Sequence, residues 1–338
     1  MAVPTRGIQS QLRLPSNREL SWVVPMEMKI LDADRVAECL EYKTLIEALR
    51  SGLTGTGSSP SRMRLETGYA SERKLLLVKP AWDEDAAIIK LLTLNEMNRE
   101  TELPFIQGVI VVFDQATGSP SCIMDARELT CRRTAAASAL AADYLAVPDA
   151  EVLTLIGTGT LAPHMALAHA VNRPIRRVNV FGRSPEKAVA TAEAIQRADP
   201  SVYTRVAADL PTAVCEAQIV CAATSSTTPL VKGAWVSNGT HIDLVGSYRP
   251  DAREADDDAI GMARVFVDDR AAAMKEAGDI LIPVEKGVIS KSDVIGDLAE
   301  LCGGVVQGRI GESEVTAFKS VGMALEDLIA AKLVLGNV

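Results

Sequence analysis

The sequence predicts an α/β fold of the doubly wound type, and residues 151–184 carry most of that prediction. This segment contains, in order, an apolar strand at Val152–Ile156, the turn Gly157-Thr158-Gly159, a helix start at Leu161-Ala162 and a second apolar strand at Val178–Phe181. Three further apolar runs, separated by helical text, follow at Ile219–Ala222, His241–Val245 and Val265–Asp268. Such a series is typical of a parallel sheet with crossover helices. Its first turn has the form GxGxxA, which indicates a Rossmann dinucleotide-binding domain.

Each small residue of this turn has a physical reason. Gly157 permits the tight turn from strand to helix, Gly159 lets the backbone approach a pyrophosphate, and Ala162 allows close packing of helix on strand. The helix N-terminus then offers free N–H groups and the positive end of its dipole to phosphates. We therefore expect the dinucleotide to contact Gly157, Thr158, Gly159, Leu161 and Ala162.

The end of the second strand indicates which dinucleotide is bound. NAD-selective folds commonly place an acidic residue here for the ribose 2′-hydroxyl, whereas this chain has Arg183 followed by Ser184. A guanidinium and a hydroxyl suit a 2′-phosphate. The sequence therefore favours NADPH as cofactor, with NADH admitted as well. The alternative interpretation is that Arg183 is a solvated residue at a strand end.

Two later strand ends extend the expected nucleotide site. Thr224-Ser225 follow the strand Ile219–Ala222, and Val245-Gly246-Ser247 lie at the end of the next one. Ligands of open α/β sheets bind at the carboxyl ends of the strands, so these residues are candidate contacts for ribose and nicotinamide. Capping of the next helix would explain Thr224-Ser225 equally well.

The chain before the glycine turn has a different pattern. A strand at MKILDA and a helical stretch ending in ALRSGL are followed by the β-like segments KLLLVKPAW, AAIIKLLTL, QGVIVVFD and SCIMDA. These segments predict an α+β region rather than a parallel sheet. An alanine-rich helix from about Leu129 to Ala146 leads into the Rossmann pattern. The final segment, Phe318–Leu335, predicts an apolar helix that packs back on the first domain.

These patterns divide the chain into four expected segments. They are a flexible extension at 1–25, the first part of an α+β domain at 26–128, the Rossmann domain at 129–315, and a C-terminal helix at 316–338 that makes the α+β domain discontinuous.

Length and composition exclude several classes of function. The 338 residues suffice for two domains, and a net charge of −9 argues against a nucleic-acid-binding surface. We expect no membrane span, because no run is long and apolar enough, and no signal peptide, because the first 25 residues lack an apolar core. The six cysteines are scattered without a CxxC pair, which favours reduced thiols in the cytoplasm. His164 and His169 are five residues apart, so no metal site is expected.

Basic residues in otherwise apolar text form a second group of candidates. They are Arg62, Lys90 within AAIIKLLTL, and Arg133 at the head of the alanine-rich helix. A charge within an apolar strand is costly unless it has a partner, so Lys90 requires an anion or a function. The alternative is that Lys90 extends its ammonium to solvent from an edge strand.

From Met28 to its end, the chain resembles the ornithine cyclodeaminase/μ-crystallin family. The resemblance rests on Pro60-Ser61-Arg62, Ile89-Lys90-Leu91, Leu103-Pro104-Phe105-Ile106-Gln107-Gly108, Leu129-Thr130-Cys131-Arg132-Arg133-Thr134-Ala135-Ala136, Ile156-Gly157-Thr158-Gly159, Val245-Gly246-Ser247, Arg253-Glu254-Ala255-Asp256 and Phe318-Lys319-Ser320-Val321-Gly322. Within the family, the segments GTGTLAPHMALAHA and NRPIRRVNVFGRS look most like the Δ1-pyrroline-2-carboxylate reductase branch of ketimine reductases.

The resemblance implies an NAD(P)H-dependent enzyme that reduces Δ1-pyrroline-2-carboxylate to L-proline and Δ1-piperideine-2-carboxylate to L-pipecolate. It also implies a homodimer whose α+β domain binds substrate and forms the subunit contact, with the active site between the two domains. Arg62 and Arg133 match the family's substrate-carboxylate arginines, and Lys90 matches its active-site lysine. Two guanidinium groups can hold a carboxylate rigidly, and a partly desolvated ammonium can deliver a proton to nitrogen.

Two departures from the family pattern bear on the substrate. Cyclodeaminases place a catalytic aspartate just after the Val-Gly turn, whereas this chain has no acid there until Asp251. Phe105 stands where several members have a hydroxyl residue. The alternatives left open are an ornithine cyclodeaminase, an alanine-dehydrogenase-like enzyme, and a non-catalytic crystallin-like protein that holds NADP(H). The retained Arg62, Lys90 and Arg133 argue against the last of these.

Overall fold

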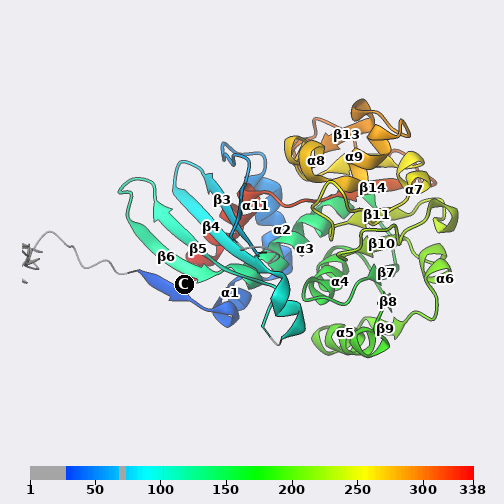
Figure 1. Ribbon diagram of the computed structural model, residues 1–338, viewed down its shortest axis with the longest axis horizontal. Coiled ribbons are helices and arrows are strands. Elements are labelled where there is room, and N and C mark those ends of the chain that lie inside the picture. The colour runs from blue at the N-terminus through cyan, green and yellow to red at the C-terminus, as the bar shows by residue number, and fades with distance from the viewer. Residues whose placement is uncertain (1–27, 68–73, 102) are drawn as a thin grey trace, which may run out of the picture.

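The computed structural model describes residues 28–67, 74–101 and 103–338. The extension expected at 1–25 lies outside these residues. In the described part, two β-sheets stand side by side with helices packed between and around them (Figure 1).

The first sheet is mostly antiparallel and has the order β1-β6-β5-β4-β3-β2. Its strands are β1 Lys29–Leu31, β2 Met63–Glu66, β3 Lys74–Trp82, β4 Ala86–Asn95, β5 Ile106–Asp114 and β6 Pro120–Asp125, with a 3₁₀ turn at Glu96–Glu100. Only the pairing of β1 with β6 is parallel. The four β-like segments expected from the sequence are the central strands of this sheet.

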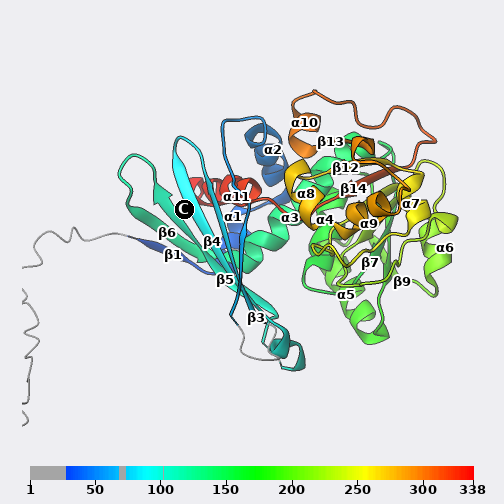
Figure 2. The ribbon, with the colours of Figure 1, turned by 45° about the horizontal axis from the view of Figure 1, so that its top comes forward.

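Helices cover one face of the first sheet. They are α1 Ala33–Cys39, α2 Tyr42–Gly52, α3 Ala126–Leu145 and α11 Ala324–Gly336. Alternate residues of the strands are buried beneath them, as in β4, where Ala86, Ile88, Lys90 and Leu92 all face inward. No helix lies over the opposite face in the described part of the chain (Figure 2).

The second sheet is wholly parallel, with the order β13-β12-β14-β11-β10-β7-β8-β9. Its strands are β7 Val152–Ile156, β8 Arg177–Phe181, β9 Tyr203–Val206, β10 Ile219–Ala222, β11 His241–Leu244, β12 Arg264–Val267, β13 Val294–Asp297 and β14 Thr316–Lys319. The strand order reverses between β7 and β10, so this is a doubly wound sheet with its topological switch point beside the glycine turn.

Helices lie on both faces of the second sheet. They are α4 Leu161–Asn172, α5 Pro185–Ala198, α6 Leu210–Cys215, α7 Asp257–Gly261, α8 Arg270–Glu276, α9 Gly278–Glu285 and α10 Leu298–Cys302, with 3₁₀ turns at Gly233–Trp235 and Lys291–Asp293. The core under α4 and α5 is continuous with the core of the first sheet. A separate core lies under α6, α7 and α9. The long buried helix α3 contacts both α4 and β14, so it joins the two sheets.

The structure corrects one expected boundary. The sequence pattern places residues 316–319 in the returning C-terminal segment, whereas in the structure they form β14 in the middle of the second sheet, hydrogen-bonded between β11 and β12. The chain then crosses to the first sheet, where α11 packs against α2, α3, β3 and β4. The helix that leads into the Rossmann pattern also starts earlier than expected, at Ala126, because Asp125 caps it by accepting from Glu128 N–H.

None of the helices in the described residues is long and apolar enough to cross a membrane. All six cysteines are free thiols, and four of them are buried.

Candidate active site

The glycine turn after β7 has the geometry that a phosphate cradle needs. Gly157 has φ +124°, and a Cβ at this position would lie 2.5 Å from Ala223 O, so only glycine fits. A Cβ on Gly159 would meet nothing within 4 Å, which leaves its backbone approachable. Thr160, the N-cap of α4, makes no side-chain capping hydrogen bond. The start of this helix therefore keeps N–H groups available to an anion.

The loops after β10 and β11 lie directly against each other. A Cβ on Gly246 would lie 2.0 Å from Thr224 O. The buried carboxylate of Glu254 joins these loops, accepting from the N–H groups of Thr224, Gly246 and Ser247 at 2.7, 2.7 and 3.2 Å. The Thr224 hydroxyl donates to the same carboxylate. The structure thus brings two of the expected cofactor-binding segments together at the switch point.

The side chains of these loops are less available than the sequence suggested. The Thr224 hydroxyl is used by Glu254, and the buried Ser247 hydroxyl donates to Ala252 O at 2.7 Å. Val245 is buried in the core. Ser225 is exposed. Backbone groups and Ser225 are therefore what these two loops can offer a ligand.

The glutamate beneath the loops belongs to a buried charge network. Lys319 lies 3.1 Å from an Asp279 oxygen and 3.9 Å from a Glu254 oxygen. The other Asp279 oxygen accepts from the N–H groups of Glu254 and Ala255. Burial raises the pKa of Glu254 to about 7, against the opposing effect of Lys319. Lys319 thus supports the loops from below through these two carboxylates.

The end of β8 shows Arg183 exposed and Ser184 already engaged. In the described chain, no hydrogen bond or ion pair holds the Arg183 side chain. Ser184 is the N-cap of α5: it accepts from Lys187 N–H at 3.2 Å and donates to Glu186 at 2.7 Å. Capping explains Ser184 without a ligand. Arg183 is the residue at this strand end that can reach for one.

A cluster of buried charges lies where the two sheets meet. Asp327 on α11 accepts from Lys90 Nζ at 2.7 Å and from Arg133 Nε at 2.8 Å, both at Oδ1. Arg133 Nη1 also donates to Glu326 at 2.5 Å. Lys90 is fully buried and Arg133 is 4% exposed. Lys90 is therefore not an edge lysine extending into solvent; it points inward to a partner from the far end of the chain.

Arg62 and a second lysine complete this cluster. Arg62 pairs with Glu276 at 2.7 Å and donates to Val321 O at 2.9 Å. Lys79 on β3 lies 3.3 Å from Asp327 Oδ2 and donates to Gly322 O at 3.3 Å. We name Arg62, Lys79, Lys90, Arg133, Glu326 and Asp327 the charge cluster. The three basic residues expected from the sequence are all in it.

Burial governs the electrostatics of the charge cluster. Desolvation lowers the pKa of Lys90 well below its usual value, with Arg133 and Lys79 adding to the effect and Asp327 opposing it. For the same chief reason, the pKa of Lys79 falls to about 8 and that of Glu326 rises to about 7. Asp327 keeps a depressed pKa, because the surrounding cations outweigh its own desolvation. A lysine in such surroundings gives up a proton readily.

The charge cluster lies at the same sheet edge as the glycine turn. The segment after β14 carries Val321 and Gly322, and its N–H groups bind Asp268 at the end of β12. Since all strands of this sheet are parallel, their carboxyl ends share one edge. The following Asp269 caps α8 by accepting from Ala272 N–H. Because Arg62 and Lys79 bind Val321 O and Gly322 O after β14, the charge cluster and the glycine turn lie toward the same edge of this sheet.

One buried group contains potential metal ligands. His169, Cys221 and Asp243 place ligand atoms within 4.8 Å of one another in the core. Asp243 accepts from Ser138 at 3.0 Å and contacts His169 Nε2 at 3.1 Å. Burial and the neighbouring Asp243 raise the pKa of the Cys221 thiol well above its usual value. Asp243 is thus engaged by Ser138 and His169, and the three side chains belong to a hydrogen-bonded network in the core.

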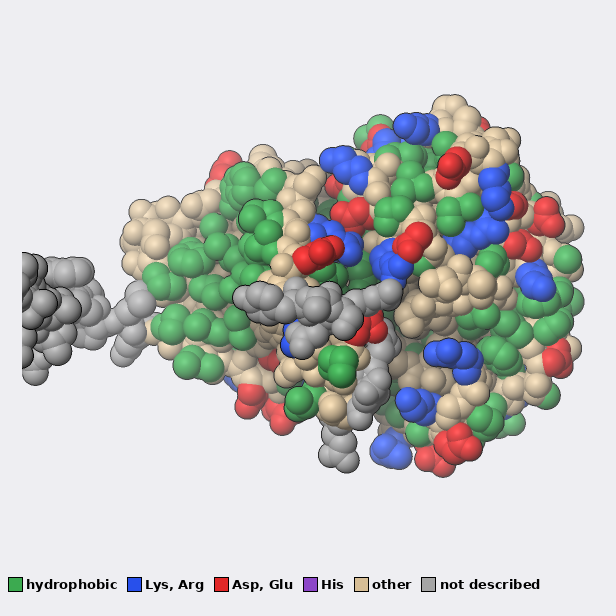
Figure 3. Space-filling view, viewed as in Figure 1, with side chains coloured by type: hydrophobic (Ala, Val, Ile, Leu, Met, Phe, Trp, Pro, Cys, Tyr) green, Lys and Arg blue, Asp and Glu red, His purple; other side chains and the backbone are tan. Residues whose placement is uncertain are grey.

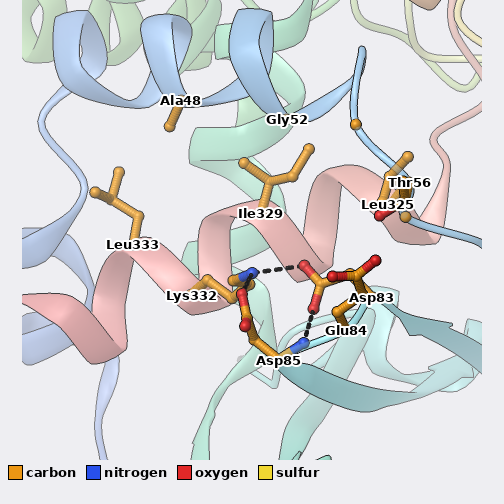
Figure 4. Close-up of a pocket in the computed structure, with 12 residues that line it drawn as sticks. Ala48, Gly52, Thr56, Asp83, Glu84, Asp85, Leu325, Ile329, Lys332 and Leu333 are labelled. Carbon is orange, nitrogen blue, oxygen red and sulfur yellow. Dashed lines mark hydrogen bonds and ion pairs between the residues drawn. The ribbon is translucent and has the colours of Figure 1, made fainter.

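A cavity of about 410 Å³ lies away from the charge cluster, between α2, α11 and the turn joining β3 to β4 (Figure 4). Lys332 reaches from α11 to Asp83 at 2.6 Å and Asp85 at 2.7 Å across this space. These contacts tie α11 to the first sheet. They help to fix the helix that carries Glu326 and Asp327.

Several residues of the site are not among those predicted from the sequence. Lys79 carried the same signal as Lys90, a charge within an apolar strand, and could have been found. The two acids of α11 interrupt an apolar helix and gave a similar signal. Glu254 gave none apart from the family resemblance, because its role depends on loops that meet only in the fold.

Known proteins resemble this chain in sequence along most of its length. A model of the ornithine cyclodeaminase/mu-crystallin family matches residues 24–338. The Δ1-pyrroline-2-carboxylate reductase of Colwellia psychrerythraea is 35% identical over 307 residues, covering 90% of this chain and 97% of the relative. The rat ketimine reductase mu-crystallin is 34% identical over 312 residues, covering 90% and 95%.

A solved structure has the same fold over nearly the full length of this chain. The Δ1-pyrroline-2-carboxylate reductase of Thermococcus litoralis, in complex with NADH and L-proline, superposes with a TM-score of 0.87 at 32% identity. The match covers 91% of this chain and 97% of that chain.

Proposed function

The chain belongs to the ornithine cyclodeaminase/mu-crystallin family, and from this premise we propose that it reduces cyclic ketimine carboxylates with NADPH. It is an NAD(P)H-dependent oxidoreductase that acts on a carbon–nitrogen bond. The proposed substrates are Δ1-pyrroline-2-carboxylate and Δ1-piperideine-2-carboxylate, which give L-proline and L-pipecolate. The observation that carries the proposal is the charge cluster, in which Lys90 and Arg133 are both buried against one oxygen of Asp327.

The arginines can bind the carboxylate of such a substrate. Among the described residues, Arg62 has partners at Nε and Nη2, and Arg133 at Nε and Nη1. One terminal nitrogen of each guanidinium remains for a ligand. Charge-assisted hydrogen bonds from two fixed guanidinium groups would orient a carboxylate and with it the ring of the substrate.

Lys90 is the proposed proton donor. Its Nζ donates to Asp327, which uses one of the three hydrogens of the ammonium. When bound, the reduced nicotinamide supplies the hydride equivalent that the imine carbon requires. Lys90 gives one proton to the imine nitrogen and becomes neutral, so that C=N is converted to CH–NH; solvent then returns the proton to Lys90.

The cofactor proposal rests on the turn after β7 and on the end of β8. The uncapped start of α4 and the open approach to Gly159 fit a pyrophosphate. The exposed Arg183 fits the 2′-phosphate of NADPH. The solved relative holds NADH, so this choice between the two cofactors is a property proposed for this chain.

Ornithine cyclisation is disfavoured by the loop after β11. It requires a base to activate an amine, and Ser247 and Tyr248 follow Gly246 where that base would stand. The nearby Glu254 has both oxygens engaged by loop N–H groups. Reduction of a preformed ring needs no such base.

A homodimer is proposed from the uncovered face of the first sheet. In register across four strands, Met63, Val78, Leu91 and Val109 point to this face. Pro80, Ile89, Val111 and Ile123 form the adjacent row. Figure 3 shows apolar side chains gathered over this part of the molecule. A contiguous apolar patch of this kind is typical of a protein–protein interface.

The proposal is tested by NADPH oxidation with a panel of substrates. We expect turnover of the two cyclic imines and negligible turnover of pyruvate with ammonia. The reverse pattern would assign the chain to alanine dehydrogenase. Binding of NADPH with no turnover of any imine would favour a crystallin-like binding protein.

A further inference from the structure

The second buried lysine of the charge cluster has no role in the steps above. Lys79 on β3 is the direct cross-strand neighbour of Lys90 on β4. Both side chains point to the helix-covered face, and both are buried, Lys79 with 4% exposure. Two ammonium groups side by side in a core repel each other, and their burial is costly unless an anion compensates them.

Both lysines lie against the same carboxylate but on different oxygens. Lys90 and Arg133 bind Oδ1 of Asp327, whereas Lys79 lies 3.3 Å from Oδ2. Two close cations therefore hold Asp327 in place without Lys79. Lys79 is secured more loosely, by this longer contact and by Gly322 O at 3.3 Å. Its main effect on Lys90 must be through charge rather than through placement of Asp327.

The charged groups around Lys90 come from three elements. Asp327 approaches from α11, Arg133 and the thiol of Cys131 from α3, and Lys79 from β3. Asp327 favours the charged form of Lys90, while Arg133 and Lys79 oppose it. Arg133 is itself paired with Glu326 and Asp327. Lys79 is thus the cation whose removal would change the field at Lys90 with least disturbance to its neighbours.

We infer that Lys79 is a positioning residue that acts through Lys90: its ammonium weakens the hold of Lys90 on its proton and makes Lys90 a stronger acid. This inference rests on the proposed function, in which Lys90 protonates the imine nitrogen. Like charges within a shared buried site favour loss of a proton from one of them. In the reaction, the proton leaves Lys90 Nζ for the substrate nitrogen, and Lys79 keeps its own.

The kinetic test compares Lys79→Met with Lys79→Arg in full-length enzyme. For Lys79→Met, we expect the basic limb of the kcat–pH profile with Δ1-piperideine-2-carboxylate and saturating NADPH to move to higher pH by roughly one unit. The plateau rate should fall by about 3- to 10-fold, because a weaker acid transfers its proton more slowly. Lys79→Arg keeps the positive charge and should leave the limb at its wild-type position. The control is Lys291→Met, which removes an exposed lysine of the 3₁₀ turn Lys291–Asp293 and should not move the limb.

A second readout does not depend on activity. In protein labelled with ¹⁵N-lysine, the Nζ resonance of Lys90, assigned by its loss in Lys90→Met, should titrate at higher pH in Lys79→Met than in wild type. If Lys79→Met does not fold, Lys79→Gln replaces it in both measurements. Coincident limbs and coincident Nζ titrations would overturn the inference, as would a lower kcat with an unmoved limb. Wild-type enzyme that reduces no imine would contradict the proposed function, while the Nζ titration would still decide the effect of Lys79 on Lys90.

Discussion

In the proposed reaction, different residues have different tasks, and single substitutions can separate them. Lys90→Met removes the proton donor and should lower kcat by about 10²- to 10⁴-fold, the usual contribution of general acid catalysis. Arg62→Met removes a carboxylate contact and should chiefly raise the imine KM, because ground state and transition state both use it. Steady-state kinetics on both variants measures the split. Normal kcat in Lys90→Met would refute its role as acid.

Arg183 tests the choice of cofactor at the same scale. Loss of a charge-assisted contact to a 2′-phosphate should cost roughly 1.5–3 kcal/mol, or about 10- to 150-fold in affinity. Arg183→Ala should therefore raise the KM for NADPH and leave that for NADH nearly unchanged. Arg176→Ala, another exposed arginine at the opposite end of β8, is the matched control. Equal weakening of both cofactors would make Arg183 structural.

Site residues could be predicted from the sequence where a charged residue stands in an apolar stretch that is expected to be buried. Lys90 stands out in AAIIKLLTL, because a charge in an apolar strand demands an explanation, and the structure supplies one in Asp327. Thr224 and Ser247 were expected to touch a ligand, but their hydroxyls serve Glu254 and Ala252 O. Such competition for a hydroxyl depends on tertiary contacts and leaves no trace in the local pattern.

Among the elements, α11 gives the fold a specific pH dependence through Glu326. Its pKa rises from an ordinary 4.5 to about 7, chiefly through burial, so the folded state binds this proton more tightly than the unfolded state. Its contribution to stability is complete below the unfolded value and is lost as the pH rises through 7. Between pH 5 and pH 7.5, the loss should be on the order of 1–3 kcal/mol.

Urea unfolding of wild type and Glu326→Gln at these two pH values measures that loss. The variant should show a smaller decrease in the free energy of unfolding, since it has no proton to release at this position. Subtraction of the two proteins cancels the histidines, which titrate in both. An equal decrease in both proteins would mean that Glu326 is ionised throughout this range.

Strand β14 shows why some elements escaped prediction. Its four residues, Thr316–Lys319, are too short for a period and stand just before an apolar helix, so they were joined to that helix. Their partners are β11 and β12, at least 49 residues earlier in the chain. The longer strands β3, β4 and β5 could be predicted from their length and composition. Short parallel strands are defined by neighbours that the local sequence does not contain.

At the scale of the whole molecule, the open face of the first sheet predicts an oligomer. Val109 on this face and Val206 on the edge strand β9 are both 39% exposed, which makes them a matched pair. Val109→Asp would place a charge in the proposed interface and should shift the protein from dimer to monomer in sedimentation velocity. Val206→Asp should leave the dimer intact. Wild-type monomers at micromolar concentration would contradict the proposed interface.

We propose above all that this site reduces a preformed ring and does not make one. One measurement tests it directly: purified enzyme is given Δ1-pyrroline-2-carboxylate with NADPH in one arm and ornithine with oxidised cofactor in the other, and proline and ammonia are quantified in both. Arg62, Lys90 and Arg133 suffice for the first reaction, whereas the loop after Gly246 lacks the base that the second requires. We predict proline from the imine and no ammonia from ornithine. Release of ammonia from ornithine at a rate comparable with imine reduction would contradict the account.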